Sequence, residues 1–72
     1  MHMQKTDVEK LEILLPHWID HNTSHIEEMK KWVSIARKEG KNETADAIEK
    51  AIDGMQQTSE ALSDAMTKLP NI

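Results

Sequence analysis

The 72-residue chain has no cysteine and carries a formal net charge of −4. Its length allows one domain, and a chain this short hides only about 60% of the surface that it exposes when unfolded. Because disulfides are excluded, we expect a metal ion or self-association to add stability. The acidic chain lacks the basic surface that nucleic acid requires, and no apolar run approaches the roughly 18 residues of a membrane span. The N-terminus does not resemble a signal peptide, so a cytoplasmic location is expected.

The first predicted helix covers residues 7–39. Thr6 and Glu9 have the spacing of a capping box, and Gly40 can end the helix in a left-handed conformation. Between them, side chains recur at alternating spacings of three and four residues, as at the a and d positions of a coiled-coil heptad. These positions are Val8, Leu11, Leu15, Trp18, Asn22, His25, Met29, Trp32 and Ala36.

Pro16 lies inside this helix. A proline there removes the backbone hydrogen bond to the carbonyl of Glu12, so we expect a kink near Pro16. The alternative is that Pro16 begins a new helix as its first residue. The heptad phase continues across it, which favours one kinked helix.

The second predicted helix covers residues 44–69 and follows a turn at 40–43. Asn42 or Thr44 is expected to cap its start, and Pro70 to end it. Its heptad positions are Ala45, Ile48, Ile52, Met55, Ser59, Leu62, Met66 and Leu69. Because the connection is short, the two helices should be antiparallel neighbours. The expected fold is all-α, an antiparallel helical hairpin of the coiled-coil type.

Further apolar side chains widen the apolar face of the first helix at the heptad's e and g positions. They are Leu14, Ile19, Ile26, Val33 and Ile35. A face this broad needs more than one partner helix. We therefore expect residues 1–72 to form one hairpin domain that dimerises with itself into a four-helix bundle.

A polar layer interrupts the predicted core, because the antiparallel register places Asn22 opposite Ser59. An unsatisfied buried polar group costs about 1–3 kcal/mol. An Asn at an a position commonly fixes the alignment of a coiled coil, which accounts for this pair.

Three histidines, His17, His21 and His25, follow one another at intervals of four residues. Neighbouring members share a helix face and can bind one metal ion. The outer two are separated by about 12 Å of helical rise, so a straight helix does not easily bring all three to one ion. A kink at Pro16, or ligands from a second chain, would solve this, and an ion at a two-fold interface could collect four or more imidazoles.

Other residues near the histidines are candidates for a weak or outer role, namely Trp18, Asn22 and Glu28. Ligation by imidazole without thiolate suits Ni(II), Cu(II), Zn(II) or Co(II). Two alternatives remain: a protein-interaction module whose histidines only pack and hydrogen-bond, and a helical bundle that senses pH. No acid/base pair or nucleophile in a cleft is apparent, so the sequence does not predict an enzyme.

The segment from His17 to His25 reads H-W-x-x-H-x-x-x-H. It resembles the nickel-binding segment of the CooJ family, accessory proteins of nickel carbon monoxide dehydrogenase. The resemblance implies a helical coiled-coil dimer that binds Ni(II) through His17, His21 and His25, with Trp18 beside them. It also implies a nickel enzyme or its maturation machinery as a partner. A better-known member of that family has a histidine-rich C-terminal tail, whereas this sequence ends at Ile72 without one. We therefore expect a role in nickel chelation or storage rather than in delivery to an enzyme.

Overall fold

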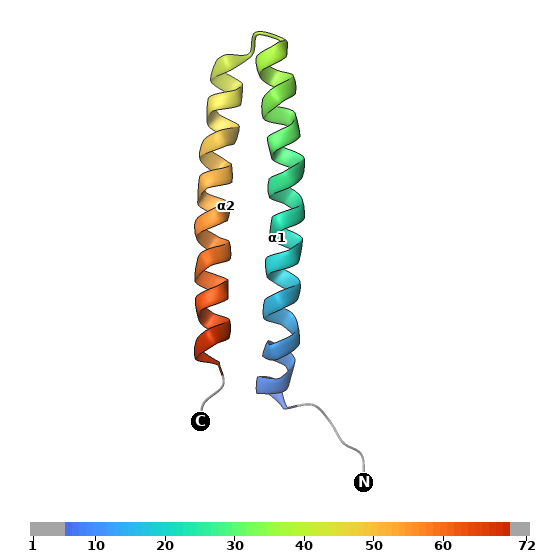
Figure 1. The fold of residues 1–72 in the computed structure, drawn as a ribbon, viewed down its shortest axis with the longest axis vertical. Helices are drawn as coiled ribbons and strands as arrows, with labels where there is room; N and C mark the ends of the chain where they lie inside the picture. Colours follow the sequence, from blue (N-terminus) through green and yellow to red (C-terminus); the bar gives the residue numbers. More distant parts are fainter. Residues whose placement is uncertain (1–5, 70–72) are drawn as a thin grey trace.

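The structure, a computed structural model, describes residues 6–69. It consists of two long helices, α1 (Asp7–Lys38) and α2 (Asn42–Lys68), which lie antiparallel and side by side (Figure 1). The described residues include no strand, and the expected helical hairpin is confirmed. Within the same residues, no helix is both long enough and apolar enough to cross a membrane.

The start of α1 is fixed by its predicted capping box. The Glu9 N–H donates to the Thr6 hydroxyl at 3.1 Å, and the Thr6 N–H donates to Glu9 Oε1 at 2.8 Å. These two bonds satisfy backbone donors that a helix start would otherwise leave free. From there α1 continues through Pro16 as one helix.

Gly40 makes the short turn between the helices possible. Its φ of 75° is in the left-handed region, where a residue without Cβ is not strained. The N–H groups of Gly40 and Lys41 donate to carbonyls in the last turn of α1. The predicted cap at Asn42 or Thr44 is wrong, because the chain reverses so quickly that Asn42 is already the first residue of α2 and Lys41 is its N-cap. The predicted stop at Pro70 lies outside the described residues.

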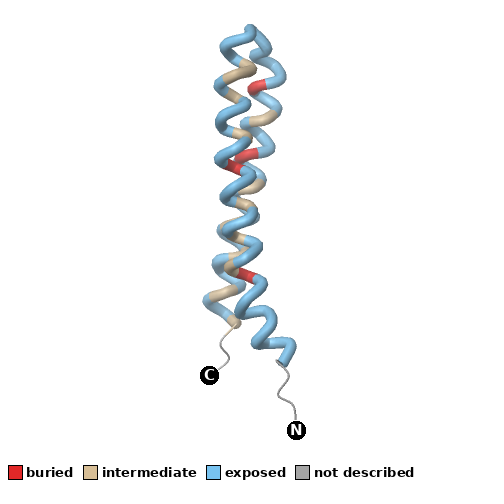
Figure 2. The backbone as a smooth tube through the Cα atoms, turned by 90° about the vertical axis from the view of Figure 1, so that its right-hand side faces the viewer, coloured by how far each residue is buried: buried red, intermediate tan, exposed pale blue. Residues whose placement is uncertain are grey.

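The seam between the helices is narrow. Its buried side chains are Leu15, Ile26, Ala45 and Ile52. Partly buried side chains continue the same line along α1, namely Ile19, Asn22, Met29, Val33 and Ala36. Figure 2 shows the buried positions as short segments separated by partly buried and exposed residues. One partner helix therefore covers only one stripe of α1.

The prediction of which face of α1 packs against α2 is wrong by part of a helical turn. The a positions from Leu15 to Ala36 pack as expected, but the d positions do not: Trp18 is 43% exposed and Trp32 is 49% exposed, while Ile26, at an e position, is buried. At 100° per residue, the exchange of d for e rotates α1 by about 50°. We attribute the rotation to side-chain size, because slim Ile and Val side chains let two helices approach more closely than indole rings do.

The polar layer lies in the seam as predicted. Asn22 is partly buried, and its Nδ2 donates to Ser59 Oγ at 2.6 Å and to the Met55 carbonyl at 2.7 Å. No buried side-chain nitrogen or oxygen among the described residues lacks a partner. Asn22 therefore links α1 to α2 at one height and fixes how the helices align.

Candidate metal site

All three histidines of the predicted ladder are exposed side chains on α1. The rotation of the seam explains this placement: His25 was expected at the seam, and the packing of the e positions turns it outward. The described chain thus presents its imidazoles on its surface.

His21 and His25 are the two members that the fold brings together. Their Nε2 atoms are 3.1 Å apart, and their rings meet edge to face with centroids 4.5 Å apart and an interplanar angle of 86°. The helix produces this pairing directly, because residues four apart lie one above the other on the same face. Without a metal, one ring can donate a hydrogen bond to the other.

The same geometry suits chelation. Two nitrogens 3.1 Å apart can both lie about 2.0–2.1 Å from one divalent ion, with an N–metal–N angle of about 95–102°. This angle falls between those of a square-planar and a tetrahedral centre, so it is compatible with Ni(II), Cu(II), Zn(II) and Co(II). The distance between the two Nε2 atoms is therefore compatible with two ligands to one ion.

His17 stands apart from this pair. Its ring is roughly parallel to that of His21, at 24°, with the centroids 6.2 Å apart. Within residues 6–69, no group of three histidine, aspartate or glutamate side chains is arranged to hold a metal ion. The sequence proposed His17, His21 and His25 as ligands, and the fold brings the rings of His21 and His25 into contact while the ring of His17 lies further away.

The three accessory candidates occupy different environments. Trp18 lies exposed, outside the core of its own hairpin. The Glu28 carboxylate accepts a hydrogen bond from the Trp32 indole Nε1 at 3.1 Å, one helical turn further along. Asn22 is engaged in the seam with partners on α2. Sequence reasoning had treated Trp32 as a core residue, whereas its side chain is exposed.

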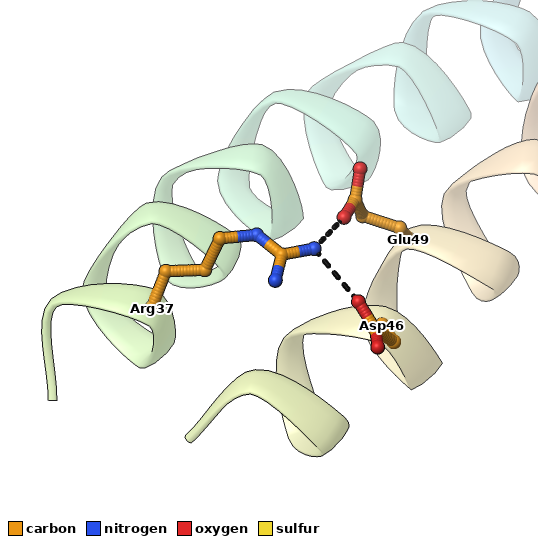
Figure 3. Close-up of polar contacts among 3 residues, drawn as sticks. All are labelled: Arg37, Asp46 and Glu49. Atoms are coloured by element: carbon orange, nitrogen blue, oxygen red, sulfur yellow. Dashed lines mark hydrogen bonds and ion pairs between the residues drawn. The ribbon is translucent and has the colours of Figure 1, made fainter. Parts of the chain in front are cut away.

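One broad side of the hairpin, which we call the ionic face, is charged and crosses the seam. It consists of Thr23, Lys30 and Arg37 on α1 with Asp46, Glu49, Asp53, Gln56 and Glu60 on α2. Shallow grooves along this side are lined by six of these eight residues, together with Glu27 and seam residues. At the turn end, Arg37 reaches from α1 to both Asp46 and Glu49 (Figure 3). The hydrogen bonds that the guanidinium donates to the Asp46 carboxylate, and then to the Glu49 carboxylate, raise the pKa of Arg37 above its usual value.

The opposite side, which we call the histidine face, follows from helical geometry, because the d and g rows of α1 point away from the ionic face. On α1 it consists of Leu11, Leu14, Trp18, His21, His25, Glu28 and Trp32. On α2 it consists of small exposed residues, Ala47, Ala51, Gly54, Thr58, Ala61 and Ala65. Sequence reasoning had overlooked this row of small residues, although its spacings of four and three residues are visible in the sequence. The imidazole pair thus lies in a mostly apolar surface.

Comparison with known proteins gives a family. No curated protein and no solved structure matches the chain. A family model described as a domain of unknown function, DUF8180, matches residues 11–69, which include both helices' seam residues and all three histidines of the ladder. The chain therefore belongs to the DUF8180 family.

Proposed function

We propose that this protein is a cytoplasmic Ni(II)-binding protein, which chelates, stores or delivers the metal and does not catalyse a reaction. The observation that carries the proposal is the distance of 3.1 Å between the Nε2 atoms of His21 and His25, which fits two nitrogens bound to one ion. The resemblance of the H-W-x-x-H-x-x-x-H segment to CooJ-type proteins favours nickel over the other ions that imidazole accepts.

Two imidazoles leave a divalent ion with open coordination positions. In this proposal a second copy of the chain supplies the missing ligands, so that two hairpins form a four-helix bundle with the ion between them. In this proposal His17 lies next to the metal ligands without being one of the chelating pair. A bend at Pro16, the preceding residue, adjusts the angle of the His17 ring. A nickel enzyme or its maturation machinery is the proposed recipient of the metal.

Calorimetric titration with Ni(II) tests the metal claim. The wild-type chain should bind with a submicromolar Kd, and the double variant His21→Ala, His25→Ala should lose about 100-fold or more in affinity, because it lacks the chelating pair. His2→Ala is the matched control, since it removes a histidine outside the ladder and should leave the affinity unchanged. Equal binding by the double variant would overturn the assignment.

Thermal unfolding gives a second measure that does not depend on the heat of binding. A ligand that binds only the folded chain stabilises it by about 2.7 kcal/mol at a free concentration of 100 times Kd. Titrations with Zn(II), Cu(II) and Co(II) under the same conditions rank the ions. If none of these ions binds or raises Tm, the exposed apolar residues around the histidines favour the alternative, a protein-interaction module without a metal.

A further inference from the structure

The histidine face combines two kinds of surface that a lone hairpin does not use. Among residues 6–69, the six large exposed hydrophobic side chains all lie on α1, and four of them, Leu11, Leu14, Trp18 and Trp32, belong to this face. On α2 the same side carries only small residues. At Gly54, an added Cβ would meet nothing within 4 Å. The packing of the hairpin therefore does not explain a glycine inside a helix, which is normally unfavourable.

The surface also has the size and charge that self-association requires. The 27 residues of α2 span about 40 Å, and two helices of about 10 Å diameter make a face of about 800 Å². This area is what each partner contributes to an interface of standard size. Between Leu11 and Ile35 the two exposed rows of α1 carry one charge, Glu28, and the row from Ala47 to Ala65 on α2 carries none. Two copies can thus meet without strong charge repulsion.

We infer that a second copy of the chain docks on the histidine face in an antiparallel arrangement, with a two-fold axis that crosses both helices at the height of the histidine pair. In this arrangement α1 packs against the partner's α1, and α2 packs against the partner's α2. The position of the axis rests on the proposed function, because it lets His21 of each copy lie opposite the partner's His25 and lets four imidazoles surround one ion.

The same axis gives the remaining residues suitable neighbours. With His21 opposite the partner's His25, Trp18 lies opposite the partner's Glu28 and Leu14 lies opposite the partner's Trp32, so an indole and then an apolar pair flank each end of the metal site. Asn22 bonds to Met55 and Ser59, which places Gly54 and Thr58 near the height of the histidines. Small residues there let the two α2 helices approach to about 8 Å, the short end of the usual range. In the other possible arrangement both turns lie at the same end, and each α1 packs on the partner's α2. The two His21–His25 pairs would then lie at diagonally opposite corners of the bundle, too far apart to share one ion.

Sedimentation equilibrium in chelator-treated buffer tests the docking surface without metal. We expect the wild-type chain to be dimeric, and Ala51→Arg or Ala61→Arg to weaken the dimer by about tenfold or more, because a long charged side chain does not fit a close helix crossing. Ser63→Arg is the matched control, an exposed position on α2 away from the histidine face. A wild-type monomer with and without Ni(II), or equal weakening by the control, would overturn the inference.

The relative direction of the two copies is tested by a distance between spin labels at Lys41→Cys, a position in the turn of an otherwise cysteine-free chain. In the antiparallel dimer the two turns lie at opposite ends, and the labels should be about 50 Å apart, since each lies about 18 residues from the axis. A distance of about 20 Å would mean that both turns lie at one end, and would overturn the arrangement. Tight Ni(II) binding by a monomer refutes only the dimer, whereas a normal dimer without Ni(II) binding refutes only the metal site.

Discussion

The two broad faces of the hairpin differ in where their polar contacts run. On the ionic face Arg37 crosses from α1 to Asp46 and Glu49 on α2 (Figure 3). On the histidine face, every polar side-chain contact found among the described residues stays within one helix. These contacts are His21 with His25, Trp32 with Glu28, and the Thr58 hydroxyl with the Gly54 carbonyl.

This difference indicates a division of roles. Contacts that cross the seam hold α1 and α2 in one alignment, and the ionic face and Asn22 supply them. The histidine face contributes little to that alignment, so its imidazoles, indoles and small residues are available for a ligand or a second chain. In the predictions below, side chains on the two faces and in the seam respond to substitution in different ways.

The largest effect should come from the seam. Ile26→Ala removes a buried side chain and should destabilise the hairpin by about 2–5 kcal/mol. Trp18→Ala, on the histidine face, should cost much less when the chain is monomeric, because that indole is 43% exposed. Urea unfolding at concentrations below dimer formation measures both. A larger loss for Trp18→Ala would show that the d positions, not the e positions, form the seam.

The sequence predicted the parts of the fold that depend on local rules. The capping box of Thr6 and Glu9, the left-handed Gly40 and the pairing of Asn22 with Ser59 each follow from residue type and spacing. It did not predict the phase of the seam, because α1 is apolar at both its d and its e positions. The heptad rule alone does not choose between two apolar rows, and side-chain size and the presence of only one partner helix decide the choice.

The second prediction concerns the three histidines. His21→Ala and His25→Ala should each lower the Ni(II) affinity by about 100-fold, while His17→Ala should lower it by about tenfold or less, because its ring lies apart from the chelating pair. Calorimetry on the single variants measures this order. The Ni(II) affinity of each variant should also fall on acidification, because protons compete with the ion for the imidazole nitrogens. Equal losses at all three positions would contradict a two-ligand site on each chain.

The candidate ligands came from the sequence, and their arrangement came from the fold. The spacing of the histidines is visible in the sequence, but it does not distinguish His17 from His25, because each lies one turn from His21. The rotation of α1 and the ring orientations single out His21 with His25. Neither feature could be read from spacing, since ring orientation depends on rotamers and the rotation depends on packing.

The third prediction concerns Asn22, whose hydrogen bonds join α1 to α2 in the seam. Asn22→Ala removes the donor to both Ser59 and the Met55 carbonyl, and should destabilise the hairpin by about 1–3 kcal/mol. The double variant Asn22→Leu, Ser59→Ala should recover most of this stability, because replacing both partners by apolar groups removes the unsatisfied pair. Urea unfolding compares the variants. If the double variant is as unstable as Asn22→Ala, the two hydrogen bonds are not the cause of the loss.

The smallest effect is expected for Gly54→Ala. The sign of its change in stability distinguishes a histidine face that is free from one that a second copy covers. In dilute solution the variant should stabilise the hairpin by about 0.8–1.0 kcal/mol, because alanine favours helix and the added methyl group meets nothing within 4 Å. At concentrations where two copies associate, the methyl group would separate the two α2 helices, so the gain should shrink or reverse. Ser63→Ala, on α2 away from the histidine face, should show no such dependence on concentration. A constant gain for Gly54→Ala at all concentrations would mean that nothing packs against this part of α2.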